Sequence, residues 1–237
     1  MNPSSARQIP VRFADRAALD RQLAREVATR LRRALKQRSQ AGLVVSGGRT
    51  PIGLFEALSR EALNWARVTV TLADERWVEP DSDDSNERLV RAHLLQHHAA
   101  AARFVGLKTP AASADAGVDE CRQRLALLLP QLDVVILGMG EDGHTASFFP
   151  GAEALGRALD PQAPEDCLAL TPLTAPHGRM TLSLARLLRC DQIYLHLCGP
   201  AKLPVLEQAL QAGPDAEMPV RALLRQTQAP VAIYWAP

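Results

Sequence analysis

A short apolar run that ends in a glycine-rich polar segment constrains the fold of this chain most strongly. Residues 134–137 read Val-Val-Ile-Leu, which is typical of a strand buried on both faces of a parallel sheet. Gly138, Gly140, Gly143 and His144 follow within seven residues. Glycine lets a backbone turn tightly and approach a ligand. Because ligands bind at the carboxyl ends of parallel strands, we predict a functional loop here, with a plain connecting loop as the alternative.

Apolar runs alternate with helical periodicity along the rest of the chain. Leucine or valine recurs every four positions from Leu19 to Leu35, which predicts one long helix over residues 16–38. The other expected strands are residues 42–46, 68–72, 168–171, 192–198 and 231–235, and the other main helices are residues 52–63, 84–95, 118–129 and a segment from 199 onward. This alternation predicts an α/β fold with a mostly parallel sheet and helices on both faces, in a single domain of residues 1–237.

Composition excludes several classes of function. The 27 basic and 26 acidic residues nearly cancel, so neither nucleic acid nor a membrane is an expected partner. The arginines of the first helix are interpreted as a solvated face rather than a nucleic-acid site. No run approaches the roughly 20 apolar residues of a membrane span, and residues 1–7 lack the apolar core of a signal peptide. The four cysteines form no C-x-x-C pair, so a cytoplasmic protein with reduced thiols is expected.

A second glycine turn follows the strand predicted at residues 42–46. Gly47 and Gly48 precede Arg49, Thr50 and Pro51, and the last two fit the N-cap and first position of a helix. Free backbone N–H groups at such a turn bind anions, and an arginine adds a bidentate phosphate donor. The alternative is a tight turn without a ligand. The pattern matches neither a P-loop nor a G-x-G-x-x-G motif, so ATP and NAD are not indicated.

Charged residues also follow the strand predicted at residues 68–72. Asp74 and Arg76 come directly after it and are expected at the same edge of the sheet, with structural ion pairing as the alternative. His93 and His97 lie one turn apart on the next predicted helix, which is also a spacing for metal ligands. Because the H-E-x-x-H pattern is absent and no third ligand is evident, we interpret them as a helix end and expect no metal.

These strand ends together predict the chemistry of the site. Arg49, Arg76 and Lys202, the last near the start of a helix, suit a phosphorylated small molecule. His144 suits a general base or acid, since histidine titrates near neutral pH. No G-x-S-x-G motif is present for an acyl-enzyme. The residues therefore permit base-activated attack of water on a phosphorylated substrate, or proton transfer within one.

Four segments carry a resemblance to a known family. Residues 46–51, residues 74–77 with Ser85 and Asn86, residues 138–150, and Gly199 with Lys202 resemble the 6-phosphogluconolactonase family, in the same order over nearly the whole chain. The resemblance implies a Rossmann-like fold shared with glucosamine-6-phosphate deaminases and ribose-5-phosphate isomerases. It also implies hydrolysis of 6-phospho-D-glucono-1,5-lactone to 6-phospho-D-gluconate, the second step of the oxidative pentose phosphate pathway. No metal or organic cofactor is expected, and the chain is expected to act as a monomer or homodimer.

The resemblance also implies roles for individual residues. His144 would be the base that activates water, Asp142 would shape its loop, and backbone N–H groups around Gly140 would stabilise the oxyanion. The phosphate and sugar would be held by Gly47, Gly48, Arg49, Thr50, Asp74, Arg76, Arg179 and Lys202. Arg49 departs from the family pattern, which often has serine there, and Pro200 is unusual beside the lysine.

Two related functions are weighed against hydrolysis. Glucosamine-6-phosphate deaminases share the Asp-Gly-His motif but continue with an Asn-Glu, and that glutamate takes part in their proton transfers. Phe148 and Phe149 stand at the corresponding positions here, which disfavours an isomerase. A non-catalytic sugar-phosphate sensor would carry a helix-turn-helix domain, whereas the roughly forty residues before the first predicted strand read as one helix.

Overall fold

The computed structural model describes residues 9–128, 132–173 and 175–237. Residues 1–7, on which the expectation of no signal peptide depends, lie outside the described residues. Leu129, the expected end of the helix at residues 118–129, also lies outside them. None of the described helices is long and apolar enough to cross a membrane.

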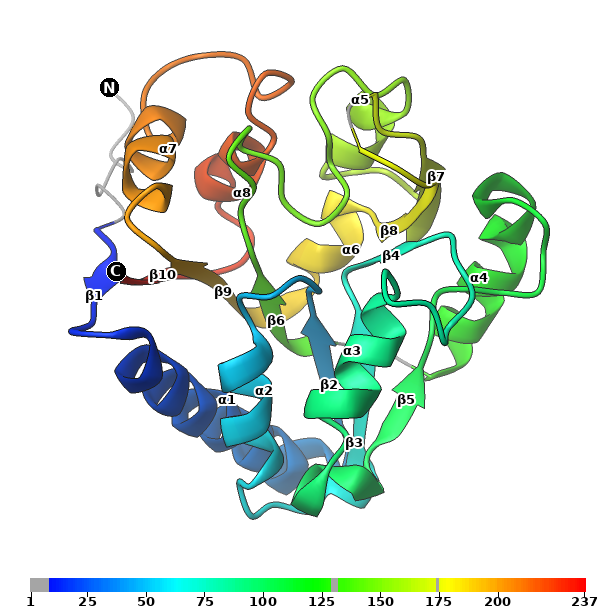
Figure 1. Ribbon diagram of the computed structural model, residues 1–237. Helices are drawn as coiled ribbons and strands as arrows, with labels where there is room; N and C mark the ends of the chain where they lie inside the picture. The colour runs from blue at the N-terminus through cyan, green and yellow to red at the C-terminus, as the bar shows by residue number, and fades with distance from the viewer. Residues whose placement is uncertain (1–8, 129–131, 174) are drawn as a thin grey trace.

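Within the described residues, seven strands form one sheet in which all neighbouring strands run parallel (Figure 1). In spatial order they are β1 (Val11–Arg12), β10 (Val231–Ala236), β9 (Cys190–Cys198), β6 (Leu132–Leu137), β2 (Ala41–Val45), β3 (Val68–Leu72) and β5 (Arg103–Val105). The prediction of an α/β fold with a mostly parallel sheet is confirmed. β1 and β5 were not predicted, because each is too short to show a pattern of its own.

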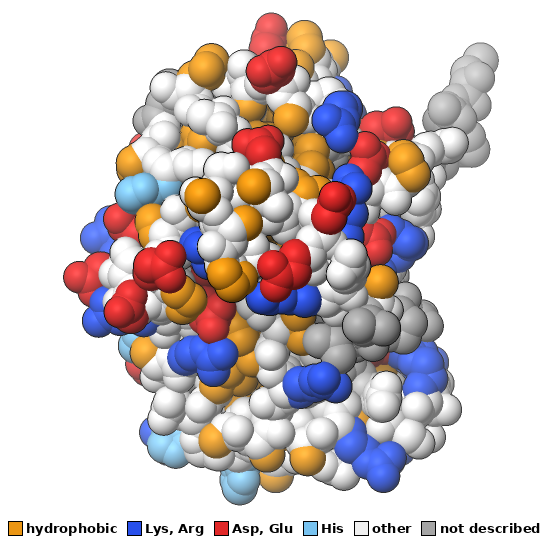
Figure 2. All heavy atoms as spheres, turned by 90° about the vertical axis from the view of Figure 1, so that its right-hand side faces the viewer, with side chains coloured by type: hydrophobic (Ala, Val, Ile, Leu, Met, Phe, Trp, Pro, Cys, Tyr) orange, Lys and Arg blue, Asp and Glu red, His pale blue; other side chains and the backbone are white. Residues whose placement is uncertain are grey.

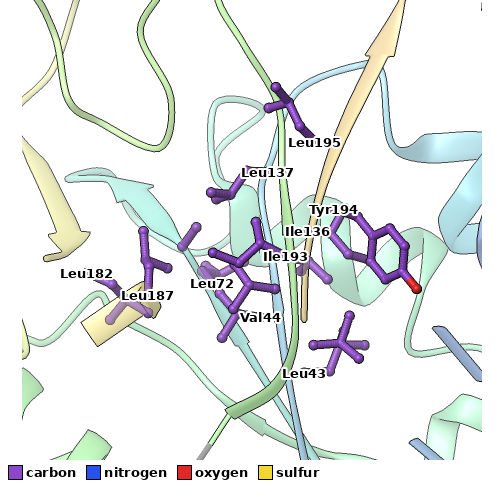
Figure 3. Packing of buried hydrophobic residues seen from close by; sticks show 14 of the residues in the cluster. Leu43, Val44, Leu72, Ile136, Leu137, Leu182, Leu187, Ile193, Tyr194 and Leu195 are labelled. Atoms are coloured by element: carbon purple, nitrogen blue, oxygen red, sulfur yellow. The ribbon is translucent and has the colours of Figure 1, made fainter. Parts of the chain in front are cut away.

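Helices cover both faces of this sheet. The α-helices are α1 (Arg16–Arg38), α2 (Ile52–Ser59), α3 (Asn86–His93), α4 (Ala114–Leu128), α5 (Leu155–Leu159), α6 (Leu184–Leu188), α7 (Lys202–Ala209) and α8 (Val220–Arg225). Tyr194 of β9 reaches α1, where its hydroxyl accepts a hydrogen bond from Arg30 Nε at 2.8 Å. In Figure 3, Leu187 of α6 lies on the opposite side of the strands from Tyr194 and Leu43. Apolar side chains are therefore buried on both faces, as parallel sheets require.

A second, antiparallel sheet lies beside the first and corrects two predictions. It consists of β4 (Asp74–Arg76), β8 (Arg179–Leu182) and β7 (Cys167–Leu170), in the order β4-β8-β7. Residues 74–76 are expected from the sequence only to follow the strand at residues 68–72, and no strand is expected at residues 179–182. The ladder between β4 and β8 instead pairs Arg76 with Arg179, so both arginines are placed by strand register.

Several expected helix ends are wrong. Pro51 occupies the N-cap of α2 without a side-chain cap bond, so Thr50 does not cap this helix, and α2 ends at Ser59 rather than at residue 63. α3 is capped by Ser85, whose side chain accepts from Arg88 N, and not by Asp84. A serine with extended backbone sits one residue nearer the helix and takes the capping position.

The two histidines of the possible metal spacing do not share a helix. α3 ends at His93, whose Nδ1 lies 3.1 Å from Glu56 Oε1. His97 has a positive φ of 48° and begins the separate 3-10 helix η2 (His97–Ala101). Another short 3-10 helix, η1 (Trp65–Arg67), leads into β3.

The molecular surface reflects the balanced composition. Acidic and basic side chains are interspersed over the face shown in Figure 2, with apolar side chains scattered between them. This mixture agrees with the nearly equal numbers of acidic and basic residues, 26 and 27. It is typical of a solvated protein surface.

A buried carboxylate joins β4 to the N-terminus of α3. Glu75 is 1% exposed and accepts backbone hydrogen bonds from Asn86 N at 2.7 Å and Glu87 N at 2.8 Å. Its side chain also accepts from Ser85 Oγ and from the backbone N–H of Arg76. Burial raises the pKa of Glu75 to about 7, although the backbone hydrogen bonds act in the opposite direction.

This raised pKa predicts a specific dependence of stability on pH. Between pH 4.5 and about 7 the folded protein keeps a proton on Glu75 that the unfolded chain releases. The linkage therefore lowers the free energy of unfolding by up to roughly 3 kcal/mol as pH rises through this window. The side chain of Glu75→Gln is neutral at every pH, so this part of the pH-dependent loss in the free energy of unfolding is expected to be absent. Urea unfolding of both proteins from pH 4.5 to 8 measures it, and identical pH profiles would contradict it.

Candidate active site

One cavity of about 210 Å³ lies where the carboxyl ends of β2, β6 and β9 meet. The predicted site residues that line it are Gly47, Gly48, Thr50, Asp74, Arg76, Gly140, His144 and Lys202. Its wall also contains Asn86, Thr145, Ala146, His196 and Cys198. Residues from five separate parts of the sequence are thus brought to one point, as expected for strand ends in a parallel sheet.

His144 is held by the carboxylate of Asp142. The Nδ1 atom of His144 lies 2.5 Å from Asp142 Oδ1, and the same oxygen accepts from the backbone N–H of His144 at 3.1 Å. Partial burial acts to raise the pKa of Asp142, but the hydrogen bonds and charge interaction with His144 outweigh it and lower the pKa below its ordinary value. An ionised Asp142 accepts a proton-bearing Nδ1, which leaves Nε2 of His144 as the basic nitrogen.

Gly140 makes room for this pair. A Cβ atom at Gly140 would lie 2.1 Å from His144 Nδ1 and 2.5 Å from Asp142 Oδ1, so no larger residue fits without displacing them. The backbone N–H of Gly140 also donates to the carbonyl of His144 at 2.8 Å and closes the loop. Ala146, in the cavity wall, has a positive φ of 48°, a strained conformation of the kind that clusters at functional sites.

Phe149 supports the imidazole from the other side of the loop. The two rings stack with centroids 4.4 Å apart and planes 30° apart. The guanidinium carbon of Arg179 lies 5.5 Å from the centroid of the same phenyl ring. Phe149 therefore connects the histidine of the cavity with an arginine behind it.

The turn after β2 is shaped by Asn86. A Cβ atom at Gly47 would lie 1.8 Å from Asn86 Oδ1, and the Asn86 amide is fixed because its Nδ2 donates to the carbonyl of Asp74 at 2.8 Å. Gly48 has a positive φ of 88°, which favours glycine. The absence of a side-chain cap leaves N–H groups of the first turn of α2 available to an anion.

Cations and one carboxylate complete the cavity. Arg76 is half-buried and donates through NH1 to the carbonyl of Asp84 at 2.5 Å. Lys202 is half-buried and makes no ion pair with any of the described residues. Asp74 is 7% exposed, and its Oδ2 accepts from Ser147 Oγ at 2.5 Å.

Three predicted site residues do not line the cavity. Arg49 is exposed, and Asp142 lies behind His144. Arg179 is 5% exposed, donates to the carbonyl of Pro176, and has a buried Nε without a hydrogen-bond partner among the described residues. Burial, and then the neighbouring charge of Arg76, lower the pKa of Arg179.

Sequence reasoning assigned no role to several residues of this site. Asn86 entered only as part of a motif, and Ser147 and His196 were not singled out. His196 is 2% exposed on β9, and only its position in an otherwise apolar run could have drawn attention to it. Within the described part of the chain, no group of three or more histidine, cysteine, aspartate or glutamate side chains could hold a metal ion.

Comparison with known proteins identifies relatives that align with nearly the whole chain, including every segment of the site. Residues 14–235 match the family described as glucosamine-6-phosphate isomerases/6-phosphogluconolactonase. A 6-phosphogluconolactonase of Rhizobium meliloti is 47% identical over 225 residues, which cover 95% of this chain and 97% of the relative. A 6-phosphogluconolactonase of Pseudomonas aeruginosa is 49% identical over 217 residues, covering 92% and 90%.

Solved structures agree with the sequence relatives. The crystal structure of a 6-phosphogluconolactonase from Shewanella baltica has 48% sequence identity and a TM-score of 0.95, and the match covers 98% of this chain and 99% of that one. A monomeric glucosamine-6-phosphate deaminase is 20% identical with a TM-score of 0.73, over 94% and 96% of the two chains. The latter likeness shows the shared fold alone.

The packing of Asn86 on the turn predicts that two glycines of this site differ in their tolerance of a methyl group. Gly47→Ala would press on the fixed Asn86 amide and is expected to lower the free energy of unfolding by about 1–3 kcal/mol. Gly138→Ala is the control, since a Cβ there meets nothing within 4 Å, and its effect is expected to stay within about 0.5 kcal/mol. Urea unfolding measures both, and equal losses would contradict the prediction.

Proposed function

The chain belongs to the glucosamine-6-phosphate isomerase/6-phosphogluconolactonase family, and from this premise we propose that it hydrolyses 6-phospho-D-glucono-1,5-lactone with His144 as the base that activates water. The observation that carries the proposal is the Asp142–His144 pair in a cavity that also contains a glycine turn and two cationic side chains. Its relatives mark the chain as a carboxylic ester hydrolase of the 6-phosphogluconolactonase class.

The geometry supports a direct hydrolytic mechanism. Nε2 of His144 takes a proton from water as the water oxygen attacks the lactone carbonyl carbon C1. Backbone N–H groups around Gly140 stabilise the oxyanion that forms, other than the N–H of Gly140 itself, which donates to the carbonyl of His144. When this intermediate collapses, the bond between C1 and the ring oxygen breaks, and the imidazolium returns the proton to that oxygen. The C1 carboxylic acid that results releases its proton to solvent, and the product is 6-phospho-D-gluconate.

Asp142 and Phe149 serve this mechanism through His144. The ionised carboxylate stabilises the imidazolium that forms when water is deprotonated. The stacked phenyl ring limits rotation of the imidazole. A lactone is already activated, so a base worth about 10²–10⁴-fold together with oxyanion donors suffices, and the proposal needs neither a metal nor an organic cofactor.

The phosphate end of the substrate is assigned to the glycine turn. Backbone N–H groups of residues 47–50 and the uncapped first turn of α2 suit an anion. Arg76 and Lys202 line the same cavity and supply positive charge, while Arg179 adds charge from behind Phe149. Asp74 suits a sugar hydroxyl. Because Arg49 is exposed, its contribution is assigned to its backbone rather than to its side chain.

The packing of Phe149 on His144 disfavours a deaminase. The deaminase pattern has a glutamate at this place, which takes part in proton transfer. Here a phenyl ring packs on His144 with 7% of its surface exposed, so no carboxylate reaches the substrate from this position. We further propose a single domain that acts in the cytoplasm as a monomer or homodimer, with the sugar lactone as its small-molecule partner.

Acid release from freshly generated 6-phosphogluconolactone tests the proposed activity. The rate with purified protein should exceed spontaneous hydrolysis by orders of magnitude, because the site supplies both a base and oxyanion donors. Glucosamine 6-phosphate is the matched substrate for the deaminase alternative. Ammonia release from it, without acceleration of lactone hydrolysis, would overturn the proposal.

Substitution of the base is the first prediction for the mechanism. His144→Ala is expected to lower kcat for the phosphorylated lactone at least about 10²-fold, because it removes the group that deprotonates water. His98→Ala, an exposed histidine of η2 outside the cavity, is the control and should retain wild-type kcat. Turnover near the wild-type value in His144→Ala would rule out this histidine as the base.

Recognition of the phosphate gives a second prediction. Arg76→Ala is expected to raise KM for the phosphorylated lactone about 10-fold or more, and to change kcat/KM for plain glucono-1,5-lactone little. Arg88→Ala is the control. Arg88 donates to the carbonyl of Asp81 as Arg76 donates to that of Asp84, in the same turn of residues 81–84, but Arg88 does not line the cavity. If wild-type protein hydrolyses both lactones with equal kcat/KM, it has no phosphate site.

A further inference from the structure

An arginine of α1 holds the glycine turn from outside the cavity. NH2 of Arg16 donates to two successive carbonyl oxygens, those of Arg49 at 2.8 Å and Thr50 at 2.7 Å. These carbonyls belong to the segment between β2 and α2 whose N–H groups face the proposed phosphate. The two N–H groups of this one nitrogen are fixed in the guanidinium plane and can bond two carbonyls in one geometry, whereas the N–H groups of a lysine ammonium rotate freely.

Arg16 is itself positioned by a buried carboxylate. Nε of Arg16 lies 4.0 Å from Asp20 Oδ2, one helical turn further along α1. Asp20 is 5% exposed, and its Oδ1 lies 3.1 Å from Nε2 of His196, a residue of the cavity wall. The carboxylate therefore lies between α1, the end of β9 and the turn.

Gly53 in the first turn of α2 completes this arrangement. A Cβ atom at Gly53 would lie 2.3 Å from Asp20 Oδ2, so the backbone of α2 approaches the carboxylate more closely than a residue with a side chain would permit. An unpaired carboxylate so near a phosphate site would repel the substrate. Arg16 is the cation beside Oδ2 of this carboxylate, and the imidazole of His196 lies against Oδ1.

We propose that Arg16 is a positioning residue for the substrate phosphate: through the carbonyls of Arg49 and Thr50 it holds the glycine turn in the conformation that presents its N–H groups to the anion. The inference rests on the proposed function, since it names the turn as the phosphate site. Arg16 does not line the cavity and does not touch the reacting atoms, so its effect falls on binding and not on the chemical step. Asp20 lies beside the guanidinium, and His196 lies on the other side of the same carboxylate.

Kinetics with two lactones test this proposal. Arg16→Ala is expected to raise KM for the phosphorylated lactone about 10-fold with kcat within about 2-fold of wild type, and to leave KM for plain glucono-1,5-lactone unchanged. Arg16→Lys, which keeps the charge but not the planar fork, should fall between the two. Arg21→Ala removes an exposed arginine of the same helix and should behave as wild type. The side chain of Arg21 makes no hydrogen bond or ion pair with any of the described residues.

Hydrogen exchange separates this inference from the proposed function. In the absence of substrate, amides of residues 55–58, which are the first hydrogen-bonded amides of α2, should exchange at least about 5-fold faster in Arg16→Ala than in Arg21→Ala, while amides of β6 should not change. Absence of lactonase activity in wild-type protein would overturn the proposed function. Wild-type KM and unchanged exchange in Arg16→Ala would overturn the role of Arg16, and so would equal increases of KM for both lactones.

Discussion

The parallel pairing of β2, β6 and β9 brings the glycine turn, His144 and Lys202 together. The ladder pairs Val45 with Ile136, and Leu137 with Leu195, so strands that lie far apart in the sequence end at one edge of the sheet. The segments that follow these strands carry the glycine turn, the His144 loop and the segment that leads to Lys202. His144 and the glycine turn therefore meet because the strands run in the same direction, as in other open parallel sheets.

Close approach of polar side chains to glycine backbone then sets the fine geometry. Asn86 occupies the space that a Cβ at Gly47 would need, and the Asp142–His144 pair occupies the space beside Gly140. Glycine is therefore needed at these two positions mainly because neighbouring side chains occupy the space of a Cβ atom, and less because the backbone must be flexible. Phe149 adds a third constraint, because it stacks on His144 where the deaminase pattern has a carboxylate. Under the proposed function, the packing that orients His144 thus also favours hydrolysis over isomerisation.

The sequence allowed the strand ends and His144 to be predicted because both depend on local patterns. A buried β-branched run followed by glycines needs no distant partner to be recognised, and the 23 residues of α1 show their periodicity directly. β4 was missed because Asp-Glu-Arg has no apolar pattern of its own, and it is a strand only through pairing with β8, about a hundred positions away. β8 was missed because it follows a proline-rich segment, although it also pairs with the nearby β7. Arg16 and His196 were missed for the same reason as β4, since their contacts with Thr50 and Asp20 join distant segments.

The central claim is that one cavity binds the phosphate at the glycine turn and presents C1 to His144. A crystal structure of the protein with 6-phospho-D-gluconate tests it most directly. The phosphate is predicted to lie within hydrogen-bond distance of the backbone N–H groups of residues 47–50 and of Lys202, with the C1 carboxylate beside Nε2 of His144. A product bound with its phosphate at His144, or bound outside this cavity, would contradict the account.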